Sequence, residues 1–264
     1  MFRFLFVAVL LACGLFASGD SWREFFDLPS LLITAGGSLA VTFLTFPWSR
    51  LRDLAALVRD LWAVKPQSRG ELAEEMRRLT RLYRIKGSRG LEGQEENVAD
   101  PFLRRGVGML IDIESEENIR EQLEGATAAF TGRYEAAQQI LLTIGKLLPS
   151  FGLIGTLIGL VLLLRQIGGQ DPEALTSSFA LALMTTLYGA LLANVVVLPL
   201  AAKLQSVEQE RRAVMRAVLE WAVSLARGAA PSVVERKLAA LCGAAAQAPT
   251  TEKSWTRRVL SWER

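Results

Sequence analysis

Four long apolar runs interrupt the chain, at residues 4–17, 28–47, 147–164 and 174–202, and none of them contains Asp, Glu, Lys, Arg or His. A helix needs about 20 apolar residues to cross the hydrocarbon core of a bilayer. The pattern therefore predicts an all-α polytopic membrane protein with four transmembrane helices, of which the first is short.

The first apolar run has a second interpretation. Arg3, an apolar core and the sequence Leu10-Leu11-Ala12-Cys13 are also typical of a signal peptide that ends in a lipoprotein cleavage box. Three further spans follow in the same chain, and the charges of the loops are easier to orient if the first helix is kept. We therefore expect a retained first span.

Between spans two and three, apolar residues recur at the spacing of amphipathic helices, and Asp100-Pro101 is a good pair for an N-cap and a first helical position. The apolar faces consist of Leu51, Leu54, Ala55, Val58, Leu61 and Trp62, then of Leu72, Met76, Leu79 and Leu82 or Tyr83. Gly87 and Gly90 are expected to break the second of these helices. The loop is thus predicted to be a helical domain.

Spans three and four are both expected to extend into the cytoplasm. No proline occurs from Ser115 until Pro149, and a helix from Ser115 to Leu164 would be about 75 Å long at ~1.5 Å per residue. The fourth span continues in the same way to Gly228. These extensions also have enough apolar positions to pack on each other as a soluble bundle. We expect a transmembrane hairpin at 1–48, a cytoplasmic helical loop domain at 49–138, a second hairpin at 139–203 and a cytoplasmic helical segment with a mobile tail at 204–264.

The positive charges orient the spans. Of 30 Lys and Arg residues, 16 lie in the loop 50–146 and 11 lie from Lys203 onward, whereas the loops around Arg23 and Arg165 hold one each. Positively charged loops stay on the cytoplasmic side, so both termini are expected to be cytoplasmic. The basic residues are interleaved with 27 acidic ones. The pI near 9.1 therefore reflects membrane topology and not a nucleic-acid partner.

Composition gives little support to catalysis or a bound cofactor. The chain is 51% apolar and contains no histidine, which removes the commonest metal ligand and neutral-pH proton carrier. The two cysteines, Cys13 and Cys242, are far apart in sequence, and on this topology both lie in the membrane or on its cytoplasmic side, so we expect no structural disulfide. There is no nucleophile motif or phosphate loop. We expect no enzyme, no cofactor and no resident metal.

The polar residues of spans three and four are hydroxyls and small residues. Gly152, Gly155 and Gly159 share one face with Thr156, and span four carries Thr185 and Thr186 at comparable depth. Glycines at this spacing can simply let two helices pack closely, and membrane threonines commonly bond to their own helix. The three hydroxyls can also bind a passing cation such as Na⁺ transiently. Without a carboxylate in any span, a second polypeptide would have to supply the negative charge.

Three segments together resemble a known family. The sequences FFDLPSLLITAGGSLAVTFLTFP (25–47), LPSFGLIGTLIGL (148–160) and MTTLYGALLANVVVLPLAAKL (184–204) are similar to those of the MotA/PomA stator subunits of the bacterial flagellar motor, within the wider MotA/TolQ/ExbB channel family. The resemblance covers nearly the whole chain. It implies an inner-membrane, ion-conducting subunit that couples Na⁺ or H⁺ flow to rotation and motility.

The resemblance also implies partners. Five copies of the chain would surround two copies of a MotB/PomB-like protein, which has one transmembrane helix, a membrane Asp and a peptidoglycan-binding domain. Ion flow past that Asp would turn the pentamer, whose cytoplasmic loops would push the rotor ring.

The resemblance gives individual residues their expected roles. Pro149 and Pro199 match the family prolines at the ends of spans three and four and are expected to act as hinges. Thr156, Thr185 and Thr186 match the threonines of the ion pathway; the pair in span four is typical of sodium-driven members, which favours sodium, with protons as the alternative. The rotor contacts correspond to Arg84 and Glu92, although Ile85, Lys86 and Gly90 depart from the family pattern.

Three alternatives remain at this point. One is a TolQ/ExbB-type energiser of outer-membrane processes, which usually has three spans and an external amino terminus. Another is a stator of a machine other than the flagellum. The third is a membrane scaffold whose threonines only bond to their own helices.

Overall fold

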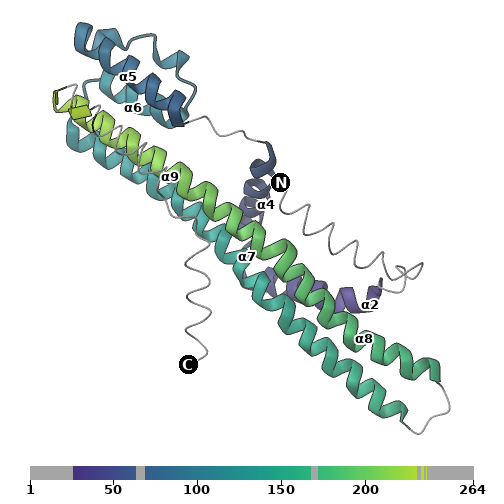
Figure 1. Ribbon diagram of the computed structural model, residues 1–264. Coiled ribbons are helices and arrows are strands. Elements are labelled where there is room, and N and C mark those ends of the chain that lie inside the picture. The colour runs from purple at the N-terminus through teal and green to yellow at the C-terminus, as the bar shows by residue number, and fades with distance from the viewer. Residues whose placement is uncertain (1–25, 64–68, 168–171, 231–232, 235, 237–264) are drawn as a thin grey trace, which may run out of the picture. The chain divides into compact units, whose positions relative to one another are not determined.

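The computed structural model describes residues 26–63, 69–167, 172–230, 233, 234 and 236, and over these residues it is helical without a strand (Figure 1). This confirms the predicted all-α class. The elements are α2 (Leu28–Leu31), η2 (Leu32–Gly36), α3 (Gly37–Thr45), α4 (Trp48–Ala63), α5 (Arg69–Lys86), η3 (Gly87–Gly90), η4 (Glu95–Asn97), α6 (Pro101–Ile111), α7 (Glu116–Gln166), α8 (Pro172–Leu191), η5 (Leu192–Val197) and α9 (Leu198–Ala226).

Three helical stretches of the described chain are long and apolar enough to cross a membrane. One is Leu28–Thr45, one lies in α7, and one lies in the continuous helix Glu173–Ala226. They coincide with predicted spans two, three and four. The run at 4–17 and the tail beyond residue 236 lie outside the described residues, as do Cys13 and Cys242.

The chain divides into two compact units. The first comprises Met1–Ala63 and Gly132–Val207, and the second comprises Val64–Thr131 and Glu208–Arg264. The long helices α7 and α9 each contribute residues to both units. The domain boundaries expected from the sequence stay predictions.

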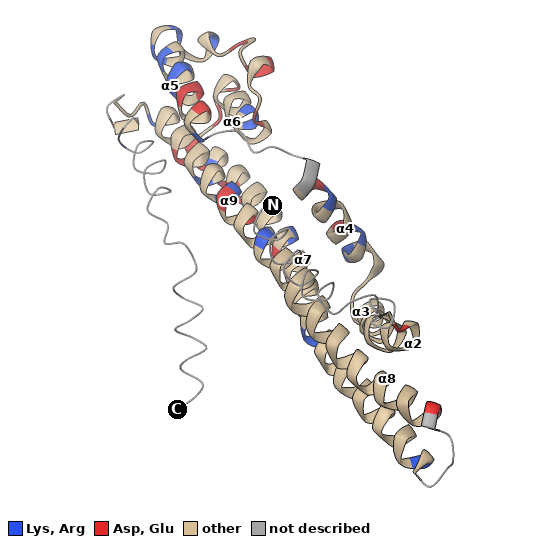
Figure 2. Ribbon diagram, turned by 45° about the vertical axis from the view of Figure 1, so that its right-hand side comes forward, with Lys and Arg blue, Asp and Glu red and all other residues tan. Residues whose placement is uncertain are grey.

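In the first unit, α8 and the adjoining part of α7 lie side by side as a helical hairpin (Figure 1). Figure 2 shows α8 without charged residues except near its start, whereas α4 carries several charged residues. The α4 helix packs against the same unit's parts of α7 and α9 through a small apolar cluster: Leu57, Ala137, Leu141, Ala201 and Leu204. Most of the large exposed apolar side chains of this unit lie on the candidate spans, as expected for contact with lipid or other subunits.

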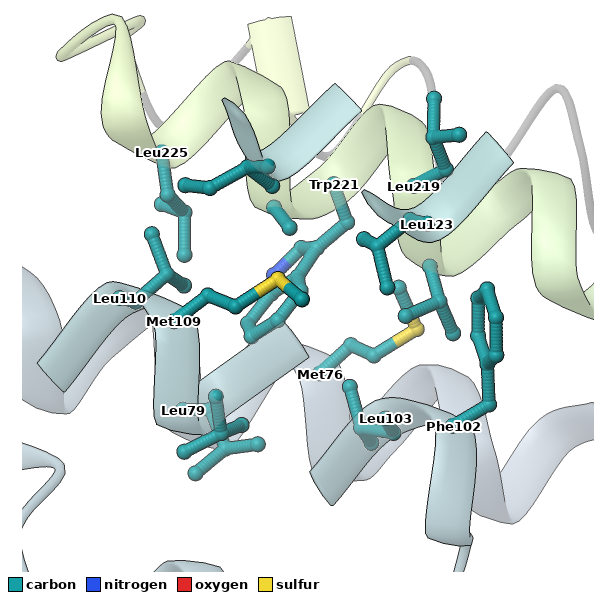
Figure 3. Packing of buried hydrophobic residues seen from close by; sticks show 14 of the residues in the cluster. Met76, Leu79, Phe102, Leu103, Met109, Leu110, Leu123, Leu219, Trp221 and Leu225 are labelled. Atoms are coloured by element: carbon teal, nitrogen blue, oxygen red, sulfur yellow. The ribbon is translucent and has the colours of Figure 1, made fainter. Parts of the chain in front are cut away.

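The second unit has a conventional buried core, which Figure 3 shows around Trp221. Trp221 is 2% exposed, and its indole N–H donates to Thr80 Oγ1 at 2.8 Å. A buried indole N–H without an acceptor would be costly, and Thr80 supplies that acceptor. The apolar face predicted at Leu72, Met76, Leu79 and Leu82 or Tyr83 lies here, together with four residues near the start of α7: Ile119, Leu123, Ala126 and Phe130.

Capping residues explain where several helices of the second unit begin and end. Asp100 Oδ1 accepts from the backbone N–H groups of Phe102 and Leu103 at 2.9 Å each, and Pro101 follows it, as predicted. The α5 helix ends at Lys86, before Gly87 with φ of +66°, which confirms the predicted break. The α9 helix ends in a Schellman motif at Gly228, with φ of +71°.

The turn after α6 has the outer hydrogen bond of this motif without a glycine. Glu114 N–H donates to Met109 C=O at 3.1 Å, and Ile113 takes the left-handed position with φ of +55°. A β-branched residue is strained there. Ile113 is also 79% exposed, so its own packing does not offset the strain.

Candidate functional site

Two of the three predicted pathway threonines meet between α7 and α8. Thr156 Oγ1 and Thr186 Oγ1 are 2.5 Å apart. Thr156 Oγ1 is also 3.0 Å from the carbonyl oxygen of Gly152 and 3.2 Å from that of Ala182. Four neutral oxygens thus gather at one point, and Thr186 is exposed on the surface of the single chain.

Small residues make this meeting possible. A Cβ on Gly152 would lie 2.9 Å from Thr185 O, and one on Gly155 would lie 2.5 Å from the Thr185 side chain. A Cβ on Gly159 would lie 2.7 Å from Ala182 Cβ and 2.8 Å from its backbone nitrogen. Contacts this short exclude any side chain, so α7 packs through these glycines directly on α8. The packing interpretation of the glycines and the close approach of the threonines are therefore compatible.

Thr185 lies on another side of α8. It is fully buried, and its hydroxyl donates within its own helix, at 3.0 Å to both Leu181 O and Ala182 O. Among the described residues this hydroxyl makes no direct hydrogen bond to Thr156 or Thr186, but it shares the acceptor Ala182 O with Thr156. A role for Thr185 on an ion pathway stays a prediction, whereas its packing against Gly155 is part of the hairpin.

The two predicted hinge prolines both lie in continuous helices. Pro149 is inside α7, and Pro199 follows the π-helical segment η5 by two residues. Because proline has no backbone N–H, each removes one hydrogen bond from its helix. Within η5, the amide of Asn194 donates to Ala190 O at 2.9 Å. At Pro149 and Pro199 the backbone hydrogen bonding of the helix is therefore interrupted. Their role as hinges stays a prediction.

A row of hydroxyls in span two was missed in the sequence. Ser30, Thr34, Ser38 and Thr42 are each at most 2% exposed. Their spacing of four residues within an otherwise apolar run was the signal that could have found them. Ser38 and Thr42 donate to carbonyls of their own helix, whereas Thr34 Oγ1 donates to Thr185 O at 3.3 Å.

The start of span two is tied to α8 in the same way. Ser30 Oγ lies 3.4 Å from Leu181 O, and the backbone N–H of Asp27 donates to Tyr188 Oη at 2.8 Å. The Asp27 carboxylate caps α2 by accepting from the N–H of Ser30 at 3.0 Å. Span two thus contacts α8 through polar groups over residues 181–188.

The predicted rotor contacts, Arg84 and Glu92, lie in the second unit, and no hydrogen bond or ion pair joins them in the described structure. Arg84 is exposed near the end of α5, and its guanidinium donates to Gly228 O at 3.3 Å, beyond the end of α9. Glu92 is exposed in the turn between η3 and η4. Charges of both signs cover the rest of α5, where an open depression is lined by Glu71, Glu74, Glu75, Arg77, Arg78, Arg81 and Asn97.

Two ion pairs hold the elements of this unit together. Burial of Asp100 disfavours its charged form, but the hydrogen bond from Arg211 and the N–H groups of α6 outweigh this and hold its pKa below the usual value. Near the start of α7, the hydrogen bonds from Arg227 lower the pKa of the Glu116 carboxyl and raise that of the guanidinium.

The chain is similar in sequence and structure to several known proteins. The sequence profile of the MotA/TolQ/ExbB proton channel family matches residues 94–217. The uncharacterized protein YtxD of Bacillus subtilis is 32% identical over 89% of this chain and 86% of its own length. Motility protein A of Borreliella burgdorferi is 30% identical over 88% of each chain. The solved flagellar MotAB stator complex from Bacillus subtilis superimposes with a TM-score of 0.80 at 27% identity, over 90% of this chain and 93% of that one.

Proposed function

Because this chain belongs to the MotA/TolQ/ExbB proton channel family, we propose that it is an ion-conducting stator subunit of the bacterial flagellar motor. It couples Na⁺ or H⁺ flow across the inner membrane to torque on the rotor. Its relatives are motility and channel proteins and not enzymes. Their match along nearly the full chain favours this function over a TolQ/ExbB-type energiser or a stator of another machine.

The observation that carries the proposal is the Thr156–Thr186 pair. Hydroxyl and carbonyl oxygens can replace part of the water shell of a cation. They bring no negative charge, and the spans at 28–45, 147–164 and 174–202 contain no carboxylate. A bare cation in such a place would be prohibitively costly. The chain therefore conducts only with a partner that supplies a carboxylate.

That partner is a MotB-type protein with one membrane helix, a membrane Asp and a peptidoglycan-binding domain. In the proposed assembly, five copies of this chain surround two copies of the partner, with the exposed face of Thr186 toward the partner helices. Both termini are cytoplasmic. Pro149 and Pro199 allow the helices to bend as the carboxylate is loaded and emptied, since each interrupts the backbone hydrogen bonds of its helix.

Arg84 and Glu92 contact the rotor ring in this proposal. Exposed charges steer and register two surfaces without holding them tightly. A contact that must form and break at every step needs such a weak interaction. The basic and acidic side chains of α5 surround Arg84 with further charges of both signs.

Reconstitution tests the central claim. The purified chain in liposomes should conduct neither Na⁺ nor H⁺, and the complex with its MotB-type partner should conduct one of them. Thr186→Val, which keeps the shape and removes the hydroxyl, should abolish most of that flux. Thr143→Val is the matched control, because the Thr143 hydroxyl donates only to Gln139 O of its own helix. Robust flux from the chain alone would refute the requirement for a partner's carboxylate.

The conducted ion follows from the same complex. Two hydroxyls at one point suit an alkali cation and favour sodium over protons. Flux measured against sodium concentration at a fixed proton gradient decides between them.

A further inference from the structure

Thr34 differs from the two buried hydroxyls that follow it in span two, Ser38 and Thr42. It is 0% exposed and lies in the π-helical turn η2. Its hydroxyl donates to the carbonyl of Thr185 on α8, whereas the Ser38 and Thr42 hydroxyls donate to carbonyls of their own helix. Of these three, Thr34 alone links span two to α8.

The carbonyl that Thr34 reaches belongs to a closely packed residue of α8, Thr185. The Thr185 side chain packs against Gly155, and its carbonyl oxygen packs against Gly152. Its own hydroxyl is used within α8. Thr185 is thereby held from the α7 side by glycines and from span two by Thr34.

Thr186 is the next residue along the helix, turned by about 100°. Whatever fixes the rotation of α8 at Thr185 also fixes the direction in which the Thr186 hydroxyl points. That hydroxyl is 2.5 Å from Thr156 Oγ1 and is exposed on its other side. A small rotation of α8 would separate the two oxygens.

Span two itself packs closely against α7 near Thr34. A Cβ on Gly37, just after η2, would lie 2.5 Å from two ring carbons of Phe151, the residue before Gly152. The backbone of span two therefore lies directly against α7 one turn from Thr34. Because span two is fixed by this packing, a hydroxyl on it can hold α8 in place.

We propose that Thr34 is a positioning residue of the ion pathway, whose hydroxyl holds α8 so that Thr186 and Thr156 present their oxygens together to the passing cation. This inference rests on the proposed function, since the ion pathway is itself proposed. Thr34 acts only through α8 and touches neither the cation nor Thr186. Its removal leaves the pathway in place with its oxygens less well aligned.

The test uses the complex with its MotB-type partner in liposomes, with uptake of ²²Na⁺ and an entrapped pH dye as the two readouts. Thr34→Val should raise the half-saturating concentration of the conducted cation about threefold. This is the ratio that corresponds to the free energy of an average interhelical hydrogen bond in a membrane. Maximal flux should be kept. Thr34→Ser, which retains a hydroxyl, should restore the wild-type value.

Thr42→Val is the matched control. Thr42 is equally buried on the same helical row, but its hydroxyl bonds only to Ser38 O, so the half-saturating concentration should not change. Three results would each overturn the inference: an unchanged value for Thr34→Val, the same shift for Thr42→Val, or no recovery with Thr34→Ser. A fall in maximal flux alone would show a merely structural role and would also overturn it.

Two further variants keep the outcome decisive. If Thr34→Val does not copurify with the partner, Thr34→Ala removes the same hydroxyl with a smaller side chain and is judged by the same criteria. Thr186→Val separates this inference from the proposed function. If Thr186→Val conducts normally, the proposed pathway is wrong; if it does not conduct while Thr34→Val behaves as wild type, only the positioning role is wrong.

Discussion

Replacing Gly159 with alanine should separate the two helices that carry the paired threonines. The new Cβ would lie 2.7 Å from Ala182 Cβ, 2.8 Å from its backbone nitrogen and 2.9 Å from its Cα, and ordinary contacts begin at 3.4 Å. Two of these three atoms are backbone and cannot rotate away. The helices must therefore part locally by about 0.7 Å, the difference between 3.4 and 2.7 Å.

The separation acts directly on the candidate site. Thr156 is three residues before Gly159, and the Ala182 carbonyl is one of its hydrogen-bond acceptors at 3.2 Å. A shift of about 0.7 Å takes this distance beyond hydrogen-bond range. Overpacking of a close-packed contact typically costs about 1–3 kcal/mol. If this cost is felt in the conducting arrangement, flux falls by about fivefold to more than a hundredfold.

Flux through the partner complex in liposomes measures the effect, and the same helix offers controls. Gly125→Ala and Gly132→Ala also lie in α7, but an added Cβ meets nothing within 4 Å at either position. Alanine should stabilise the helix there by about 0.5–1 kcal/mol, since glycine is a poor helix former. Wild-type flux from Gly159→Ala, with normal assembly, would refute the claim that close packing of α7 on α8 sets the pathway.

Three further predictions concern the second unit. Asp100→Ala should destabilise it by about 3–5 kcal/mol, because Arg211 loses its buried partner and α6 loses its cap. Asp100→Asn can keep the cap and should cost less. Faster amide hydrogen exchange in α6 measures the loss, and Asp112→Ala, at an exposed position, is the control. Since the pKa of Asp100 is lower in the folded protein than its usual value near 3.8, its contribution is complete above about pH 4 and is lost as the pH falls through the folded pKa. An acid titration followed by circular dichroism should therefore show a steeper loss of structure below pH 4 in wild type than in Asp100→Asn. Ile113→Gly should stabilise the turn after α6 by about 1–2 kcal/mol by removing the left-handed strain, and slower exchange of the Glu114 amide would show it; unchanged exchange would contradict the strain.

The helices that could be predicted from sequence were those with a strong local signal. Asp100-Pro101, Gly87 and the long proline-free stretch before Pro149 each mark a helix end or a continuous helix by a rule that acts over a few residues. The apolar face of α5 was also correct, because it packs into a core that only an amphipathic helix can complete.

What could not be predicted depends on the rotation of one helix against another. In α4, Leu57 is the fully buried residue of the cluster, whereas Leu54, Val58 and Leu61, which gave the visible periodicity, are only partly buried against it. Thr185 and Thr186 are neighbours of the same type, and only the packing of Gly155 decides which is buried. The π-helical segments η2 and η5 have no sequence signal of comparable strength, and they shift the faces of their helices.

The contrast between Thr185 and Thr186 bears on why two threonines stand together in span four. A buried hydroxyl bonded to its own helix adds little to a membrane helix beyond a shape that fits a glycine. An exposed hydroxyl in the same membrane helix must instead meet another polar group, since lipid offers it no hydrogen bond. Thr185 thus fixes the helix pair, whereas Thr186 contacts Thr156, is exposed on its other side, and in the proposed assembly faces a group on another chain. If the charge that completes the proposed site comes from another chain, electrostatics alone would keep an unpartnered subunit closed to ions, without a separate gate.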